Sequence, residues 1–456
     1  MKNRVVRGVL RPFLMLIPFI APLATLAAPA NATLSRDEQR IVTAAASQND
    51  RSIALLEKMV NINSGTMNLA GVERIGRIMM AELQPLDFTV EWKPMSAVGR
   101  AGHVIATHHP AHTRDGAGSG KRILLTGHLD TVFELDSPFQ RYERRGQVAE
   151  GPGANDMKDG LAIMVGALRA LQAAGALARS DITIVLDGDE EDAGHPLAQA
   201  RADLIAAGAQ SDVALEFEAL ATENGHDMGT IARRSAIDWT LRTTATSGHS
   251  SGVFSAESGF GANYELTRIL DAFRRELREP NATYNVGLVL GGASAAINAD
   301  GVRGEASGKT NIIAGQAIAK GDLRTLSNAQ TDRIESRMRA VVADHLPGTG
   351  ATIEFGDGYP AMAPTDGNRG LLRRLNEINA ALGFPAMAEL DPLQRGAGDI
   401  SFVADKVDCL VGFGAVGQGS HAPGETVDLD SFDRQIKRTA LLIERLSRTP
   451  RAMPLR

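Results

Sequence analysis

The chain has 456 residues and a formal net charge of −6 at pH 7, with 43% hydrophobic and 22% charged residues. A chain of this length can bury a large core and most often forms two domains, and its composition excludes a largely disordered protein. The negative charge argues against a nucleic-acid-binding function.

The first 32 residues form a candidate secretory leader. A basic start is followed by an apolar stretch over about 13–28, and small residues offer cleavage sites that end at Ala30 or Ala32. The alternative is an uncleaved membrane anchor, which two prolines within a stretch near the short end of a spanning helix disfavour. We expect a cleaved signal, export to the periplasm or the medium, and no stable membrane association afterwards.

Helical and strand-like patterns alternate after the leader. Ser35 and Glu38 form a capping box that predicts a helix running toward Val60, and a second helical pattern covers about 68–86. Short apolar runs predict strands, with helical stretches such as 160–175 between several of them. The runs are HVIAT (103–107), RILLTG (122–127), DITIVLDGD (181–189), DVALEF (212–217) and CLVGFG (409–414). This alternation predicts an α/β domain with a mixed, mostly parallel sheet flanked by helices.

The segment from 229 to 355 has a different pattern. Strand-like alternation at IDWTLRTTATS and AIAKGDLRTLS is interleaved with helical patterns over about 258–278 and 328–345. The segment therefore predicts a compact α+β domain inserted into the main one. The main domain becomes discontinuous, with residues 33–228 and 356–456.

Cys409 is the only cysteine and lies in the apolar run CLVGFGAV. An intrachain disulfide is therefore impossible. We interpret Cys409 as a buried structural residue, because a catalytic thiol requires an exposed, electropositive setting.

Adjacent carboxylates at Glu190 and Glu191 end the strand-like run DITIVLDGDEEDAG. In open α/β folds, the carboxyl ends of the strands border the ligand crevice. One carboxylate of such a pair can bind a metal while its neighbour transfers a proton. A solvated acidic turn is the competing interpretation.

Other acidic and imidazole residues also follow strand-like runs. His128 ends RILLTGH, and Asp130 is spaced to accept a hydrogen bond from its ring, although a His-x-Asp pair is often an ordinary turn. Asp156 follows a glycine-rich loop just before a helix, where it could bridge two metals or simply cap the helix. Glu218 and His421 complete a set that could form one metal centre.

The chain resembles the family of dinuclear zinc aminoacylases and carboxypeptidases that includes bacterial glutamate carboxypeptidase. The resemblance covers about residues 50 to 446 and rests on an ordered series of motifs. These are GHLDTV, GPGANDMKDG, DGDEEDAG, FE, SGHSS, DLRTLS, RGAGD and GSHAPGE. It implies a zinc-peptidase domain with an inserted lid or dimerisation domain over 229–355.

The resemblance implies two zinc ions per subunit. His128 and Glu218 correspond to ligands of one ion, Glu191 and His421 to ligands of the other, and Asp156 to the bridging carboxylate. A water shared by the ions would attack the scissile carbonyl. Histidine and carboxylate ligands without cysteine are typical of hydrolytic zinc sites.

Two further features follow from the resemblance. Glu190 corresponds to the general base. Asp130 is a further candidate catalytic residue because, by its spacing, it would orient the ligand His128. A cis peptide bond is expected between Asp156 and Met157.

The inserted domain is expected to contribute further groups. His249 corresponds to a histidine that crosses a homodimer interface to stabilise the oxyanion. Asn311 and Arg324 correspond to groups that bind the α-carboxylate of the substrate, and Gly396 to a backbone contact with the substrate. Asp399 is expected to orient the structure near Gly396.

Three residues depart from the family pattern. Asp159 replaces a glycine, His195 replaces a small residue, and Glu216 adds a carboxylate two positions before Glu218. Asp159 could perturb its loop or cap its helix. Glu216 makes the choice of metal ligand ambiguous, and we prefer Glu218 because it matches the FE pair.

Together these features predict an exported zinc-dependent metallopeptidase that removes a C-terminal amino acid, such as glutamate, from a peptidyl or acyl substrate. An aminoacylase, a dipeptidase or a desuccinylase on the same scaffold is the main alternative. A non-catalytic binding protein is a remote one, because Glu190 and a full ligand set are retained.

Overall fold

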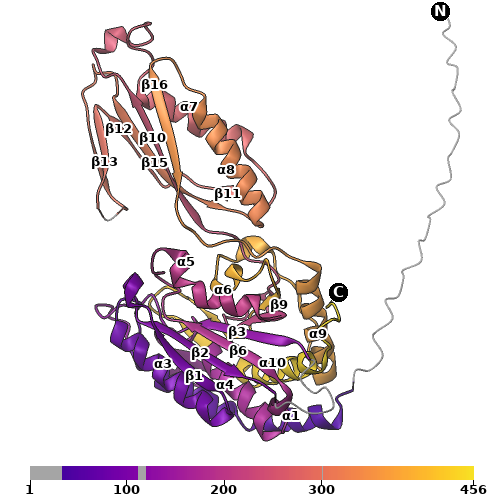
Figure 1. Cartoon of the computed structure of the whole chain (residues 1–456). Helices are drawn as coiled ribbons and strands as arrows, with labels where there is room; N and C mark the ends of the chain where they lie inside the picture. The colour runs from indigo at the N-terminus through magenta and orange to yellow at the C-terminus, as the bar shows by residue number, and fades with distance from the viewer. Residues whose placement is uncertain (1–32, 111–119, 300, 456) are drawn as a thin grey trace, which may run out of the picture.

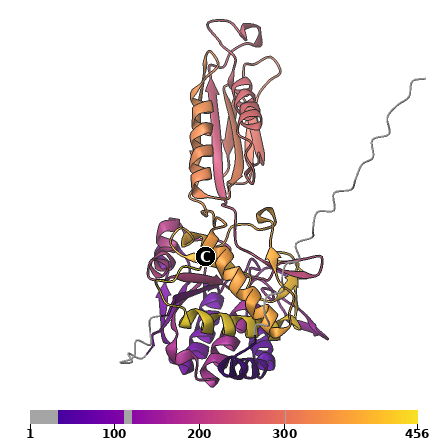
Figure 2. The ribbon, with the colours of Figure 1, turned by 90° about the vertical axis from the view of Figure 1, so that its right-hand side faces the viewer.

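The computed structural model describes residues 33–110, 120–299 and 301–455, so the expected leader lies outside the described residues. Two lobes are joined by a narrow waist, and the chain between Ile237 and Phe355 forms the upper, elongated lobe (Figures 1 and 2). Within the described residues, no helix has the length and apolarity needed to cross a bilayer.

A six-stranded sheet forms the centre of the lower lobe, in the order β1-β2-β6-β3-β7-β18. The strands β6, β3, β7 and β18 are parallel, whereas β1 and β2 form an antiparallel edge. The bounds are β1 Thr89–Pro94, β2 Gly102–His108, β3 Arg122–His128, β6 Asp181–Asp187, β7 Val213–Glu216 and β18 Asp408–Val411. Since β18 follows the inserted lobe and pairs with β7, the lower domain is discontinuous, as predicted.

Helices cover both faces of this sheet. On one face, α4 and α10 pack against the sheet, and α1, α2 and α3 pack against these two helices. On the other face, α6 contacts β6. The bounds are α1 Arg36–Ala46, α2 Asn49–Val60, α3 Leu69–Leu83, α4 Lys158–Ala173, α5 Leu197–Ala200, α6 Ala202–Ala209, α9 Asp366–Leu382 and α10 Ser431–Arg448. Both faces of β3 are therefore buried, which explains its uninterrupted apolar run: Ile123 and Leu125 join one core, and Leu124 joins the other together with buried Cys409.

The helix predicted from Ser35 toward Val60 is divided into α1 and α2. The capping box of Ser35 and Glu38 is present. The hydroxyl of Ser47, however, donates to the Ala44 carbonyl at 2.6 Å at the end of α1, and this local bond competes with continuation of the helix. The second predicted helix begins as expected at its cap Asn68, and the 3₁₀ turn Gln84–Leu86 follows it.

Two smaller sheets flank the lower lobe. One has the order β19-β20-β5-β4, and the other β17-β9-β8. Their bounds are β4 Glu143–Arg145, β5 Val148–Glu150, β8 Thr222–Glu223, β9 His226–Gly229, β17 Ala388–Glu389, β19 Val416–Gln418 and β20 Thr426–Asp428.

The upper lobe, which we call the lid, is an antiparallel sheet covered by helices on one face. Its strands are β10 Ile237–Ala245, β11 Thr283–Tyr284, β12 Leu288–Gly292, β15 Gln316–Arg324 and β16 Thr349–Phe355, with a hairpin of β13 Ser294–Ile297 and β14 Gly304–Ser307; its helices are α7 Ala262–Glu276 and α8 Asn328–Ala343. The predicted alternation in β10 is confirmed, because Ile237, Trp239 and Leu241 are buried while Asp238 and Arg242 are exposed. Two extended segments connect the lobes, and Arg233 pairs with Met362 between them.

Candidate metal centre and active site

The parallel strands bring His128, Glu190 and Glu218 to one edge of the sheet. His128 ends β3 and lies opposite Asp187, the last residue of β6. Glu190 follows β6 after a short turn, and Glu218 lies two residues beyond β7, on the other side of β3. The carboxyl ends of the strands therefore form the site, as expected for an open α/β sheet.

Two loops supply the remaining residues. Asp156 precedes α4 and is joined to Met157 by a cis peptide bond, which confirms that expectation. The helix cap itself is Met157 and forms no side-chain capping bond, so the interpretation of Asp156 as a helix cap is wrong. His421 lies between β19 and β20 with a positive φ of 67°.

These residues form two groups that share Asp156. The Nε2 atom of His128 is 3.1 Å from Asp156 Oδ1 and 3.8 Å from Glu218 Oε1. The Nε2 atom of His421 is 3.1 Å from Asp156 Oδ2 and 3.2 Å from Glu191 Oε2. In each group, one ligand atom per residue lies within 4.8 Å of the others. Each oxygen of Asp156 therefore faces a different histidine.

The crowding of carboxylates controls the protonation of the histidines. Hydrogen bonds to Asp156 and Glu191 raise the pKa of His421 to about 11. Burial opposes protonation of His128, but hydrogen bonds to Asp130 and Asp156 outweigh it and raise the pKa of His128 well above its usual range. Burial raises the pKa of Glu191 to about 7. The carboxylates therefore favour positive charge at the centre of each of the two groups.

The donor set fits two divalent cations. Its ligand atoms are imidazole nitrogens and carboxylate oxygens, which suit zinc in hydrolytic sites. Glu191 has a side chain only 5% exposed, and its Oε1 atom is buried without a hydrogen-bond partner. A solvated acidic turn would not bury this carboxylate, whereas a cation ligand would require an oxygen free of other bonds.

Asp130 orients His128 and binds the acidic turn, which we define as the turn that carries Glu190 and Glu191. The Nδ1 atom of His128 is 3.1 Å from the Asp130 carbonyl and 3.3 Å from its Oδ1 atom, so the ring proton belongs on Nδ1 and Nε2 is free to bind a cation. The Asp130 carboxylate accepts the backbone N–H groups of Glu190 and Glu191, both at 3.1 Å. It also accepts the hydroxyl of Thr66 at 2.6 Å.

Replacing Thr66 by valine is expected to weaken the affinity of the candidate site for a divalent cation such as zinc about 10- to 100-fold, because Asp130 loses one of the three hydrogen bonds that orient its carboxylate. Competition with a chromogenic chelator measures the affinity. The matched control is Thr126→Val, because the Thr126 hydroxyl is buried within β3 without a hydrogen-bond partner. An equal loss of affinity in both variants would contradict this role of Thr66.

The structure separates Glu216 from Glu218. Glu216 accepts the guanidinium of Arg233 at 2.5 Å and the Ile400 N–H at 2.9 Å, so its oxygens are engaged away from the histidines. Glu218 is the carboxylate that approaches His128.

The other two departures lie outside both groups. Asp159 is buried in the first turn of α4 and accepts the Ala415 N–H at 2.6 Å. Burial raises the pKa of Asp159 well above its usual range. His195 is exposed and is joined to Pro196 by a cis peptide bond.

Glu425 supports the loop that carries Asp156, a role that no motif spacing indicates. Its carboxylate is fully buried and accepts the N–H groups of Gly153, Asn155 and Asp156 at 3.2, 2.7 and 2.9 Å. The only signal in the sequence is its position at the end of GSHAPGE.

The proposed substrate-binding residues lie at opposite ends of the lid. Arg324 ends β15 beside the waist, and a Cβ atom placed on Gly396 would lie 3.7 Å from its Nη1 atom. His249 and Asn311 lie beyond the far end of β10, where the Ser250 N–H donates to the Asn311 carbonyl at 3.0 Å. The structure therefore brings Arg324 and Gly396 together but leaves His249 and Asn311 away from the metal ligands of the same chain.

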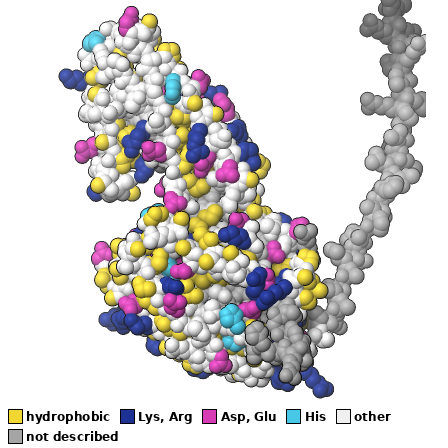
Figure 3. Space-filling model, viewed as in Figure 1, with side chains coloured by type: hydrophobic (Ala, Val, Ile, Leu, Met, Phe, Trp, Pro, Cys, Tyr) yellow, Lys and Arg dark blue, Asp and Glu magenta, His cyan; other side chains and the backbone are white. Residues whose placement is uncertain are grey.

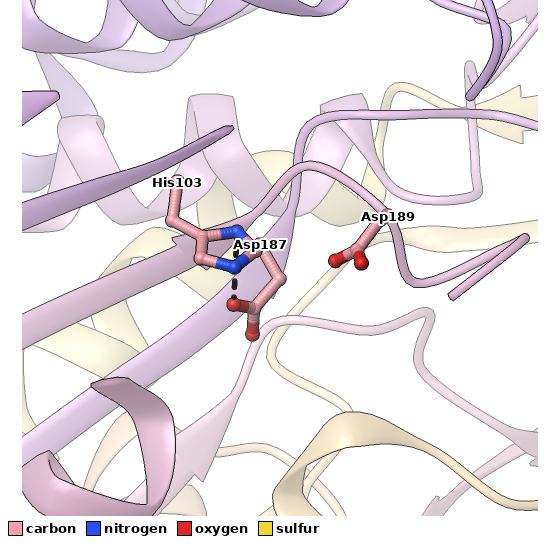
Figure 4. A group of neighbouring side chains, drawn as sticks. All are labelled: His103, Asp187 and Asp189. Atoms are coloured by element: carbon pink, nitrogen blue, oxygen red, sulfur yellow. Dashed lines mark ion pairs between the residues drawn. The ribbon is translucent and has the colours of Figure 1, made fainter. Parts of the chain in front are cut away.

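A third cluster of imidazole and carboxylate groups lies buried behind the acidic turn (Figure 4). The Nδ1 atom of His103 is 3.2 Å from Asp187 Oδ1, but it accepts the Gly188 N–H at 3.1 Å, while Nε2 is 3.0 Å from the Ala200 carbonyl. Both ring nitrogens are therefore engaged. Burial raises the pKa of Asp187 well above its usual range. Asp189, the third residue of the cluster, pairs with Arg201 at 2.7 Å, so neither it nor the His103 ring is free to bind a cation.

Arg201 connects the His103 cluster to residues at the waist between the lobes. Its buried guanidinium pairs with Asp189 and Asp399, each at 2.7 Å, which agrees with an orienting role for Asp399. It also donates to the Tyr359 hydroxyl at 2.7 Å, and that hydroxyl donates to the Glu190 carbonyl at 3.1 Å. The backbone of Glu190 is thus held on both sides.

A model of the peptidase family M20/M25/M40 matches residues 124–445. Carboxypeptidase G2 of Pseudomonas sp. (strain RS-16) is 25% identical over an alignment of 447 positions that covers 95% of this chain and 98% of that protein. Succinyl-diaminopimelate desuccinylase of Gluconacetobacter diazotrophicus is 24% identical over 336 residues, which are 72% of this chain and 82% of that protein.

Solved structures share the fold at low sequence identity. Aminopeptidase PepT from Bacillus cereus superposes with a TM-score of 0.66 at 16% identity, covering 88% of this chain and 99% of that one. The Bacillus subtilis protein YXEP, described as a dinuclear metal binding peptidase, has a TM-score of 0.59 at 15% identity, with the same coverage of both chains. These two structures contain the same arrangement of helices and strands.

Proposed function

Because the chain belongs to the peptidase family M20/M25/M40, we propose that it is a zinc-dependent hydrolase that cleaves the amide bond to a C-terminal amino acid, as a glutamate carboxypeptidase does. The observation that carries the proposal is the geometry of Asp156, whose two oxygens face His128 and His421 at 3.1 Å each. This arrangement suits a carboxylate shared by two cations.

Six side-chain roles follow for the centre. His128, Asp156 and Glu218 would hold one zinc ion, and Asp156, Glu191 and His421 the other. The two ions would polarise the scissile carbonyl and make the attacking water more acidic. Glu190 would take a proton from that water and transfer it to the leaving nitrogen.

The surroundings of Glu190 support its role as the base. Proximity alone does not separate it from the ligands, because one of its oxygens lies near His128 and Glu191. Among the described residues, Glu191 contacts His421, whereas Glu190 forms no ion pair with either histidine, which leaves its carboxylate available to accept a proton. Hydrogen bonds with Asp130 and Tyr359 fix the backbone of Glu190, so the position from which its side chain extends is also fixed.

Arg324 is positioned to bind the α-carboxylate of the substrate. Asp322 contacts its Nε atom at 2.8 Å, while its Nη1 atom faces Gly396. A guanidinium can bind a carboxylate through two parallel N–H groups. The backbone of Gly396 would form the opposite side of this subsite.

The proposal includes a homodimer in which the lid of one chain delivers His249 and Asn311 to the site of the other. The nine residues of β10 lead away from the waist over about 30 Å. The lid stands clear of the lower lobe, with an open notch between them (Figure 3). The Ser251 N–H donates to His249 Nδ1, so the ring proton belongs on Nε2, where it can stabilise an oxyanion.

We also propose export to the periplasm or the medium. The support is the basic and apolar pattern of the first 32 residues, which lie outside the described part of the chain.

A desuccinylase is the second candidate, because desuccinylases of several bacteria are also relatives of this chain. An aminoacylase or a dipeptidase would use the same centre. A non-catalytic binding protein is disfavoured by the retention of Glu190 beside a complete ligand set.

Hydrolysis assays with the zinc-loaded protein test the proposed function. N-acyl amino acids and dipeptides with varied C-terminal residues are the substrates, and release of the free amino acid is measured. We expect hydrolysis of some of them, loss of activity with a chelator, and recovery when zinc is added back. Hydrolysis that persists after complete removal of metal would contradict the proposal.

A further inference from the structure

A cavity of about 470 Å³ lies beside the candidate metal centre. Three of its lining residues are chain neighbours of proposed metal ligands: Asn155 precedes Asp156, Ala219 follows Glu218, and Ser420 precedes His421. A substrate held at the centre would therefore have part of its structure next to this cavity.

Arg395 is the only charged residue among the described residues that line the cavity. One guanidinium nitrogen donates to the carbonyl of Ala219, and the Nε atom is buried without a hydrogen-bond partner. No carboxylate oxygen of the described residues lies within ion-pair distance of Arg395. The buried Arg201 and Arg233, in contrast, both pair directly with carboxylates.

Arg395 is partly buried, and a partly buried guanidinium without an acidic partner favours an anion that joins it. Burial lowers the pKa of Arg395, and the nearby charge of Arg233 acts in the same direction, yet an arginine keeps its proton in a protein. The acidic groups that act most strongly on its charge are Glu218, Glu216 and Asp156. Glu216 is already paired with Arg233, and the other two would be neutralised by bound cations. The remaining partner is an anionic group that enters the cavity.

We propose that Arg395 is a specificity-determining residue that binds a second carboxylate of the substrate. This inference rests on the proposed function, in which Arg324 binds the α-carboxylate. The preferred substrates would then be dicarboxylates. The second carboxylate can come from an acidic acyl group, such as succinyl, or from the side chain of the amino acid that leaves, such as glutamate.

The test compares kcat/KM of the zinc-loaded protein for N-acetylalanine, N-acetylglutamate and N-succinylalanine. We expect one of the two dicarboxylates to exceed N-acetylalanine about 10- to 100-fold, since a charge-assisted hydrogen bond has an effect of this size. Arg395→Gln should remove this advantage and leave N-acetylalanine unchanged, which also shows that the variant folds. The substrate that loses its advantage identifies the source of the second carboxylate.

Two further variants sharpen the comparison. Arg395→Lys keeps a cation and should retain part of the preference. Arg144→Gln is the control, because the exposed Arg144 also donates to neutral oxygens, those of Gly146 and Gln147, but lies outside the cavity lining. It should leave all three values unchanged.

The outcomes separate this inference from the proposed function. Similar kcat/KM values for the three substrates, or an equal loss for all three in Arg395→Gln, would overturn the role of Arg395 and leave the hydrolase assignment standing. Failure of the zinc-loaded protein to hydrolyse any N-acyl amino acid or dipeptide would overturn the proposed function and this inference with it.

Discussion

Replacing Glu190 by glutamine is expected to lower kcat by about 10²- to 10⁴-fold while both zinc ions stay bound. Glutamine has nearly the same shape but cannot accept the proton of the attacking water. The backbone N–H of Glu190 donates to Asp130, and its carbonyl accepts from the Tyr359 hydroxyl. Neither hydrogen bond involves the Glu190 side chain, so the turn should keep its conformation. Steady-state kinetics and the zinc content of the dialysed protein measure the two effects.

Neighbouring carboxylates provide the contrasts for this prediction. Glu191→Gln should reduce the zinc content, because Glu191 is a proposed ligand that contacts His421. Asp192→Asn should change neither quantity, because Asp192 forms an exposed ion pair with Arg100. An unchanged kcat in Glu190→Gln would remove Glu190 as the base, and loss of zinc from it would identify Glu190 as a ligand.

Replacing His249 by alanine is expected to lower kcat about 10²- to 10³-fold without loss of zinc, because one donor to the oxyanion disappears. The location of His249 at the far end of the lid adds a second expectation. A heterodimer of one His249→Ala chain and one Glu190→Gln chain should recover roughly half of the wild-type activity, since one of its two sites has both residues intact.

Differently tagged chains allow this heterodimer to be purified and its composition verified. Each homodimer of a single variant serves as the control and should remain nearly inactive. If verified heterodimers are as inactive as the homodimers, His249 acts within its own chain or not at all, and the cross-subunit arrangement is wrong.

The sequence was sufficient for the fold class and for the residues that end parallel strands. His128 and the pair Glu190 and Glu191 each follow an apolar strand, so their meeting at one sheet edge follows from local patterns. Motif order then identified Asp156 and His421, whose loops do not belong to that sheet. Their approach to the strand ends is a tertiary contact that periodicity does not encode.

The supporting residues were beyond sequence reasoning for the same reason. Glu425 binds a loop about 270 positions earlier in the chain, with sequence separations of 272 and 270 for Gly153 and Asn155. Thr66 meets Asp130 across 64 positions. The FE pair favoured Glu218 over Glu216, but the partner that engages Glu216, Arg233, is evident only in the structure. Such contacts depend on how separate elements pack, and no local pattern specifies them.

A crystal structure of the zinc-loaded Glu190→Gln protein, with anomalous scattering recorded at the zinc edge, tests the central claim most directly. The claim is that Asp156 is shared by two cations while residue 190 binds neither. We expect two zinc peaks, one beside His128 and Glu218 and the other beside Glu191 and His421, with Asp156 between them. A single peak, or a peak in contact with Gln at position 190, would contradict the account.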